Sequence, residues 1–285
     1  MYIYEDFSIY NGMRTMANYI KRIEIMSLWS GRHHIIWELK PTVNILSGIN
    51  GVGKSTILNK LVQSLDSKEN ALNNHAIPGI NIEFSPREAT HIRFDVIRSI
   101  DRPLLHGDMI DKLTDEHIST ELDFQLYQLQ RRYLDYQVNI GNRMIEMLMD
   151  NDPEIRNKAT LIAQTKKRFQ DAVDLLFGET GKKIDRKSNE IRFIQMDEEL
   201  SPYQLSSGEK QLLIILLTVL AEDEQPYVLF MDEPEISLHI EWQQKLIGLI
   251  RNLNPNAQII LTTHSPAVIM DGWIDAVTEV SDIIQ

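Results

Sequence analysis

Cysteine is absent from this chain of 285 residues, and aromatic residues make up only 7% of it. The lack of cysteine excludes disulfide bonds and thiolate metal sites, as is common in cytoplasmic proteins. Long hydrophobic runs are also missing, because the longest, Leu212 to Ala221, is about half of the ~20 residues that a membrane span needs. The N-terminus has no basic segment followed by an apolar one, the pattern of a signal peptide. We therefore expect a cytoplasmic protein with no membrane partner.

Positive charge is in short supply, since 29 Lys and Arg residues stand against 41 Asp and Glu residues and give a formal net charge of −12. Nucleic-acid affinity comes from Lys and Arg displacing counterions from phosphates, so this composition does not support a dedicated nucleic-acid-binding module. A local basic patch stays possible, and its candidates are Lys166, Lys167, Arg168, Lys182, Lys183, Arg186 and Lys187. We interpret these residues as a solvated surface in preference to DNA contacts.

The hydrophobic pattern divides the chain into three parts. Residues 1–18 have no clear period and are interpreted as an N-terminal tail. Residues 19–101 and 178–285 alternate strand-like and helix-like segments, which predicts an α/β core. Strands are expected near 19–29, 33–40, 42–46, 81–100, 191–196, 227–231 and 258–263, and helices at 54–65, after 206 and at 241–253.

Residues 102–177 are predicted to be a helical insertion. Apolar residues recur there at heptad spacing in two runs: Leu122, Leu126, Leu129, Tyr133, Tyr136 and Ile140, then Ile155, Ala159, Ile162, Phe169, Val173 and Leu176. The residues Asn151-Asp152-Pro153 between the runs supply a cap and a helix-start proline. We therefore expect a helical hairpin, which is either a projecting arm about 40 Å long at ~1.5 Å per residue or a subdomain packed on the core.

A glycine-rich segment follows the third expected strand and opens a helix. It reads GINGVGKST and fits G-x-x-x-x-G-K-[ST], a loop whose backbone N–H groups surround phosphates. Its candidate ATP-binding residues are Gly48, Asn50, Gly51, Gly53, Lys54, Ser55 and Thr56. We expect Lys54 to reach the β- and γ-phosphates and the Ser55 hydroxyl to bind Mg²⁺.

The segment Tyr227 to Pro234 is an apolar strand that ends in two carboxylates. Asp232 is the candidate second Mg²⁺ ligand, and Glu233 is the candidate base that polarises the attacking water. A solvated acidic turn is the alternative. The phosphate loop in the same chain makes the catalytic interpretation the stronger one.

Two further motifs flank this strand in sequence. Ser206, Gly208 and Glu209 begin an apolar helix whose N-terminus suits a phosphate, although alone they would only indicate a helix cap. His264 leaves the end of another apolar strand, where α/β proteins bind ligands, and is a candidate for sensing the γ-phosphate.

Together these motifs, in this order, resemble the ABC ATPase family. The resemblance covers residues 19–100 and 184–270 and implies that Ser206 and Gly208 of one subunit close on the ATP held by Lys54 of another, so a homodimer is expected. His239 stands where a transporter subunit would have aspartate, and no glutamine-bearing loop is evident around residues 83–99. The chain is more similar to the soluble branch that contains structural-maintenance-of-chromosomes (SMC) ATPases and the OLD-type ATPases of phage defence.

Three functions are compatible with this resemblance. The leading one is an ATPase switch that dimerises on Mg-ATP and gates a separately encoded soluble effector, such as a nuclease in phage defence. About 20 residues follow His264, so we do not expect the C-terminal nuclease domain of full OLD nucleases in this sequence. The alternatives are a DNA-sensing ATPase of the repair type and, with the poorest fit to the motifs, a transporter energy subunit.

Overall fold

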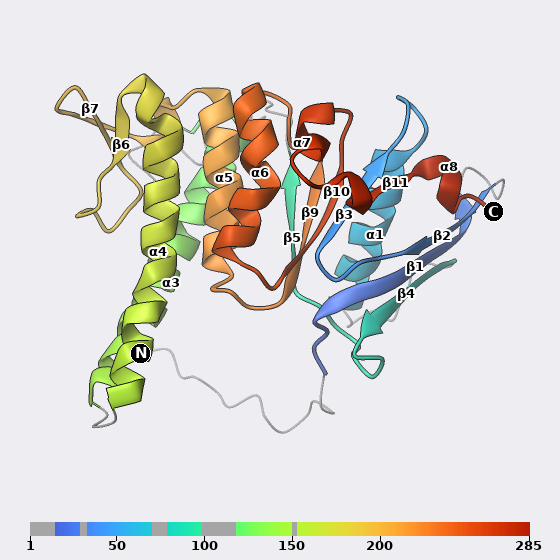
Figure 1. The fold of residues 1–285 in the computed structure, drawn as a ribbon, viewed down its shortest axis with the longest axis horizontal. Coiled ribbons are helices and arrows are strands. Elements are labelled where there is room, and N and C mark those ends of the chain that lie inside the picture. Colours follow the sequence, from blue (N-terminus) through green and yellow to red (C-terminus); the bar gives the residue numbers. More distant parts are fainter. Residues whose placement is uncertain (1–14, 29–32, 70–78, 99–117, 150–152) are drawn as a thin grey trace.

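The computed structural model of this chain describes residues 15–28, 33–69, 79–98, 118–149 and 153–285, and gives the backbone alone at 67–69, 98 and 153–162. A five-stranded sheet lies at its centre, in the order β11-β3-β10-β9-β5 (Figure 1). All neighbouring strands in it are parallel. The strands are β3 (Val43–Ser47), β5 (Phe94–Arg98), β9 (Tyr227–Asp232), β10 (Ala257–Thr262) and β11 (Val277–Glu279).

Both faces of this sheet are buried. Val228 and Phe230 of β9 pack in one apolar cluster with helix α1 (Lys54–Glu69), whereas Leu229 and Met231 of the same strand belong to a second cluster with helix α5 (Ser207–Ala221). Successive side chains of a strand point to opposite faces, so a strand that is apolar at every position fits a sheet covered on both sides. The helices α1 and α5 consequently lie on opposite faces of the parallel sheet (Figure 1).

Smaller elements complete the body. An antiparallel sheet of order β2-β1-β4 covers α1 and consists of β1 (Tyr19–Leu28), β2 (His33–Glu38) and β4 (Ile80–Ser85). A second antiparallel sheet contains β6 (Lys182–Ile184), β7 (Phe193–Gln195) and β8 (Glu198–Leu200). The remaining helices are α3 (Glu121–Met149), α4 (Pro153–Phe177), α6 (Ile240–Leu253), α7 (Pro266–Met270) and α8 (Val280–Ile283), with 3₁₀ turns at Gly178–Thr180, Pro202–Gln204 and Ile274–Ala276. No helix among the described residues is long and apolar enough to cross a membrane.

The helices α3 and α4 form the expected hairpin. All six predicted contact residues of α3 are at most 7% exposed, and Phe169, Val173 and Leu176 of α4 are buried with them. These residues share one apolar cluster with α5 and α6, so the base of the hairpin belongs to the main core. Ile155, Ala159 and Ile162 lie outside the described side chains, and Asn151 and Asp152 lie outside the described residues.

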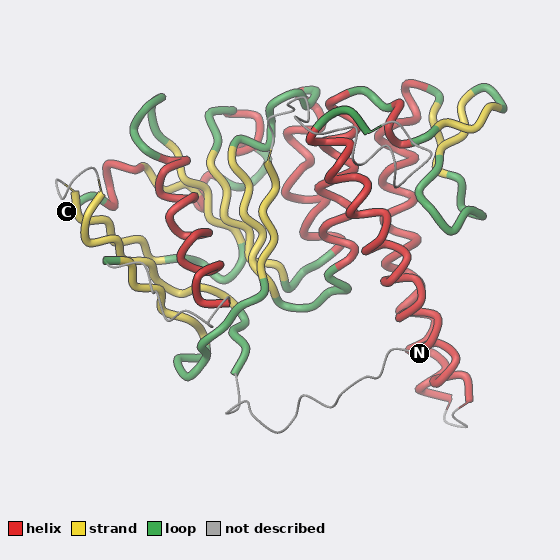
Figure 2. Tube along the Cα trace, turned by 180° about the vertical axis from the view of Figure 1, so that it is seen from behind, coloured by secondary structure: helices red, strands yellow, loops and turns green. Residues whose placement is uncertain are grey.

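The far end of the hairpin projects beyond the body of the molecule (Figures 1 and 2). Ile145, Leu148 and Met149, near the end of α3, are 55%, 55% and 80% exposed. The hairpin therefore combines the two expected arrangements, a base packed on the core and a projecting end. The domain division itself stays a prediction, because residues 1–14 and the boundary at 101–102 lie outside the described residues.

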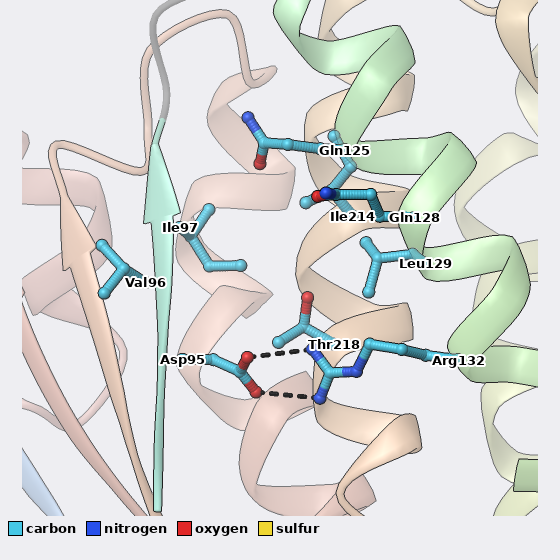
Figure 3. Close-up of a pocket in the computed structure, with 9 residues that line it drawn as sticks. All are labelled: Asp95, Val96, Ile97, Gln125, Gln128, Leu129, Arg132, Ile214 and Thr218. Atoms are coloured by element: carbon cyan, nitrogen blue, oxygen red, sulfur yellow. Dashed lines mark hydrogen bonds and ion pairs between the residues drawn. The ribbon is translucent and has the colours of Figure 1, made fainter. Parts of the chain in front are cut away.

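Arginines of the hairpin form ion pairs with β5 and with the turn between α5 and β9. Figure 3 shows Arg132 of α3 paired with both carboxylate oxygens of Asp95 on β5, at 2.9 and 3.2 Å, beside a cavity of about 140 Å³. Arg132 also pairs with Glu222 at 2.6 Å, in the turn between α5 and β9. In the same turn, Asp223 forms an ion pair with Arg143 of α3, and Glu224 forms one with Arg168 of α4. The turn therefore links the hairpin to the C-terminal end of α5.

Candidate functional site

The glycine-rich segment joins β3 to α1, as expected. Gly51 and Gly53 have φ angles of 82° and 99°, in the left-handed region that glycine occupies without strain. Lys54 is only 4% exposed, and its ammonium donates hydrogen bonds to the carbonyl oxygens of Gly48 at 2.9 Å and Ile49 at 3.3 Å. The loop thus curls around the lysine head group, while Asn50 and Thr56 are exposed beside it.

Three side-chain oxygens meet where β9, β10 and α1 come together. The Ser55 hydroxyl donates to Oδ1 of Asp232 at 2.9 Å, and the Thr262 hydroxyl donates to the same oxygen. Thr262 lies opposite Asp232 in the β10–β9 register and opposite Leu46 in the β10–β3 register, so these strand ends coincide. A carboxylate and a serine hydroxyl are oxygen donors of the kind that Mg²⁺ prefers. No sequence pattern predicted Thr262 as part of the site, because a threonine at a strand end carries no signal of its own.

His264 lies between the lysine of the phosphate loop and the second carboxylate. Its Nε2 is 2.7 Å from Nζ of Lys54 and 3.0 Å from Oε1 of Glu233. A single ring nitrogen can accept from the ammonium or donate to the carboxylate, so the position of one proton decides which neighbour it holds. Residues 54, 233 and 264 are distant in sequence, and the structure brings them into one chain of contacts.

The backbone at Glu233 is held in an uncommon conformation. Its φ angle is 48°, in the left-handed region that non-glycine residues rarely adopt. Its amide donates to both the carbonyl and the hydroxyl oxygen of Thr262, each at 3.1 Å. These hydrogen bonds from β10 hold the backbone of Glu233 in place directly after the end of β9. Uncommon backbone conformations of this kind are frequent at functional sites.

The motif at the start of α5 lies apart from the phosphate loop, on the other face of the sheet. Ser206 caps the helix through a reciprocal capping box with Glu209. Gly208 is packed so closely that an added Cβ would lie 2.3 Å from the carbonyl oxygen of Ser237, in the loop after β9. Ser206 itself is exposed.

Glu209 faces inward and is 3% exposed. Its carboxylate pairs with Lys182 at 2.9 Å and accepts hydrogen bonds from the backbone N–H and hydroxyl of Ser206. Burial alone would raise the pKa of this carboxyl, but the bonds from Lys182 and Ser206 outweigh burial and hold the pKa below its ordinary value. The geometry gives Glu209 a part in shaping the helix start, and its predicted contact with ATP stays a prediction.

Most of the basic candidates have partners within the chain. Arg168 pairs with Glu224, Lys182 with Glu209, and Arg186 with both Asp171 and Asp174. Lys166 donates to the side chain of Gln137. The exposed remainder is Lys167, Lys183 and Lys187. These pairings favour the interpretation of a solvated surface over a DNA-binding face.

Comparison with known proteins gives a family, relatives and a fold. The family model described as "AAA domain, putative AbiEii toxin, Type IV TA system" matches residues 91–271, more than half of the chain. "Retron Vc95 probable ATPase" of Vibrio cholerae serotype O1 biovar El Tor is 35% identical over 99 residues, which cover 30% of this chain and 19% of that protein. "Septu protein PtuA" of Bacillus thuringiensis is 37% identical over 84 residues, which cover 25% of this chain and 21% of that protein. The matched part therefore spans about a fifth of the length of these curated relatives.

A solved SMC head, the "SmcHead bound to the C-winged helix domain of ScpA", superimposes with a TM-score of 0.53 at 14% identity. The superposition covers 89% of this chain and 92% of that one. At this identity the likeness concerns the fold alone. It confirms the predicted fold class, an α/β core of the ABC-ATPase type, and the predicted resemblance to SMC-like ATPases.

Proposed function

This chain belongs to the AAA domain family whose model it matches, and on that premise we propose that it is an ATPase switch that binds Mg-ATP, dimerises on it and gates a separate effector. The observation that carries the proposal is the meeting of Lys54, Ser55, Asp232, Glu233 and His264 at one edge of the parallel sheet. Lys54 and Ser55 begin α1 after β3, and the other three lie at or just after the ends of the neighbouring strands β9 and β10, where α/β proteins of this kind bind ligands.

Binding of the triphosphate is assigned to the loop from Gly48 to Ser55 and the first turn of α1. The backbone N–H groups there and the positive end of the helix favour phosphate. Lys54 now bonds to carbonyl oxygens of its own loop, and these contacts are exchanged for phosphate oxygens when ATP enters. Because the ammonium is already buried, it has little water to lose in that exchange.

Ser55 and Asp232 fit a magnesium ion. Their oxygens are 2.9 Å apart, and both are donor types that Mg²⁺ accepts. When bound, the ion would neutralise charge on the β- and γ-phosphates. Thr262 holds the same oxygen of Asp232, and so orients that carboxylate.

Glu233 and His264 are assigned to the hydrolytic step. Glu233 orients the attacking water and takes its proton, while the ring of His264 contacts the γ-phosphate. His264 lies against Oε1 of Glu233 at 3.0 Å, and the Glu233 side chain is 30% exposed, so water can reach this carboxylate while the contact is in place.

Dimerisation is proposed from the positions of the two helix starts. Lys54 begins α1 and Ser206 caps α5, and these helices lie on opposite faces of the sheet. A second copy is therefore the natural source of the serine and glycine of this motif for the phosphates. Ser206 is exposed to solvent, so a second copy could contact it.

The effector is proposed to be a separately encoded protein, such as a nuclease, within a phage-defence system. Support comes from the relatives named as a retron ATPase and as the Septu protein PtuA. The projecting end of the hairpin, with Leu148 and Met149 exposed, offers an apolar surface for such a partner.

Two variants test the ATPase assignment. Lys54→Ala removes the phosphate contact and is expected to abolish ATP binding in isothermal titration calorimetry. Glu233→Gln is expected to keep binding and to lower turnover by roughly 10²–10⁴-fold, the usual cost of losing a general base. Glu198→Ala, an exposed carboxylate on β8, is the control and should match the wild type. Wild-type turnover in Glu233→Gln would show that this carboxylate does not carry the reaction.

A further inference from the structure

Glu235 lies two residues beyond the proposed base, in the loop between β9 and α6. The loop is tightly bonded to itself, because Ile236 N–H donates to the carbonyl of Glu233 at 3.2 Å and Leu238 N–H donates to the carbonyl of Glu235 at 2.9 Å. Ser237 adopts a φ of 70°, which closes the second turn. The backbone that carries the Glu235 carboxylate is therefore fixed by hydrogen bonds within the loop.

The side chain of Glu235 reaches across to the loop after β10. Its Oε1 accepts hydrogen bonds from the backbone N–H groups of His264 at 2.9 Å and Ser265 at 3.2 Å, and from the hydroxyl of Thr263. One oxygen therefore holds three consecutive residues. The other oxygen, Oε2, is buried and has no hydrogen-bond partner within the described part of the chain.

Gln243 of α6 supports the same bridge. Its amide nitrogen donates to the carbonyl of Leu238 at 2.9 Å, and its amide oxygen accepts from the Ser265 hydroxyl at 2.6 Å. The loop that carries His264 is consequently tied at its backbone by Glu235 and at its end by Gln243. Without Oε1 of Glu235, the N–H of His264 at the end of a buried strand would lose this acceptor, whereas the N–H of Ser265 would keep the Thr263 hydroxyl oxygen at 2.9 Å.

We propose that Glu235 is a positioning residue for His264. Its Oε1 holds the loop after β10 in the place where the imidazole of His264 contacts both Lys54 and Glu233. In the described part of the chain, the Glu235 side chain has no hydrogen bond or ion pair with Lys54 or Glu233, and it acts through the backbone of His264. Its effect on turnover rests on the proposed ATPase function. Its effect on the place of the His264 ring does not.

The turnover experiment compares Glu235→Ala, Glu235→Gln and the exposed control Glu198→Ala. Alanine removes the acceptor, and a misplaced catalytic group costs roughly 10²-fold in rate, so kcat is expected to fall by about that factor. KM for ATP is expected to stay unchanged, because the loop from Gly48 to Ser55 is untouched. Glutamine keeps one acceptor oxygen and nearly the same shape, so it should restore kcat to within a few-fold.

A double variant separates positioning from a general loss of structure. If Glu235 acts through the imidazole, adding Glu235→Ala to His264→Ala should lower kcat no further. A loss that multiplies in the double variant would assign Glu235 an independent role and overturn the proposal. Thermal unfolding of each variant shows whether it is folded.

The ring of His264 provides a readout that needs no turnover. Its ¹H–¹³C resonance, identified by its absence from His264→Ala, should be the same in wild type and Glu235→Gln and should move in Glu235→Ala. An unmoved resonance in folded Glu235→Ala would refute the positioning role even if the wild type hydrolyses ATP. A moved resonance in a protein that hydrolyses no ATP would uphold the positioning role and reject the proposed function.

Discussion

The contact between Gly208 and Ser237 offers a sharp test of the packing at the start of α5. In Gly208→Ala the new Cβ would lie 2.3 Å from the carbonyl oxygen of Ser237. This is roughly 1 Å inside the normal C···O separation of about 3.3 Å. The atom in the way belongs to the backbone of a tight turn, with φ of 70° at Ser237, so it has no free side-chain rotation with which to yield.

The size of the effect follows from two opposed contributions. Overpacking of this kind costs about 1–3 kcal/mol, and replacing a helical glycine by alanine gains about 0.5–1 kcal/mol. The difference lies between about 0 and 2.5 kcal/mol, and because the clash is with backbone we expect Gly208→Ala to lower the free energy of unfolding by about 1–2 kcal/mol. That corresponds to a decrease in Tm of roughly 2–8 °C for a domain of this size.

Gly248→Ala is the matched control. Gly248 also lies in a helix, α6, and an added Cβ there would meet nothing within 4 Å. Only the helical gain remains, so this variant should be more stable than wild type by about 0.5–1 kcal/mol. Thermal and urea unfolding of both variants measures the contrast. Equal stability of the two would refute the close approach of α5 to the loop after β9.

Two further predictions concern the surroundings of the site. Lys182→Met leaves the buried Glu209 carboxylate unpaired and is expected to cost about 3 kcal/mol of unfolding free energy at pH 7. The wild-type contribution of Glu209, whose folded pKa is lowered, is present above its ordinary pKa and disappears as pH falls through the lowered value, so denaturant unfolding should show this cost shrinking in acid. Replacing residues 146–157 with a short glycine-rich linker removes the projecting end of the hairpin and should leave ATP turnover unchanged, because the base stays in the core. If that variant no longer bound ATP, the projecting end of the hairpin would be shown to contribute to the ATPase core.

Local signals account for what the sequence predicted well. The phosphate loop is contiguous, so its glycines, Lys54 and Ser55 were recognisable together. Strands β9 and β10 are apolar at nearly every position, and the sequence predicted them as strands near 227–231 and 258–263. The heptad spacing of α3 predicted the residues that are buried in the hairpin.

Tertiary contacts account for what was missed. The strands β6, β8 and β11 are three residues each, too short for a period to be visible, and were not predicted separately. Thr262 and Glu235 act through partners about 30 positions away in the chain, and no spacing rule announces such contacts. The burial of Glu209 against Lys182 depends on β6, and no local pattern in the sequence indicated that ion pair.

Two copies of this chain are proposed to complete one ATP site. The direct measurement is the molar mass of Glu233→Gln by light scattering with ATP, with ADP and without nucleotide. We expect a dimer with ATP alone, and a monomer when Lys54→Ala or Ser206→Arg is added to the same variant. Ser206→Asn, which keeps a capping oxygen for α5, separates loss of the helix cap from obstruction of the interface. An ATP-bound wild-type monomer that hydrolyses at full rate and is unaffected by Ser206→Arg would contradict the account.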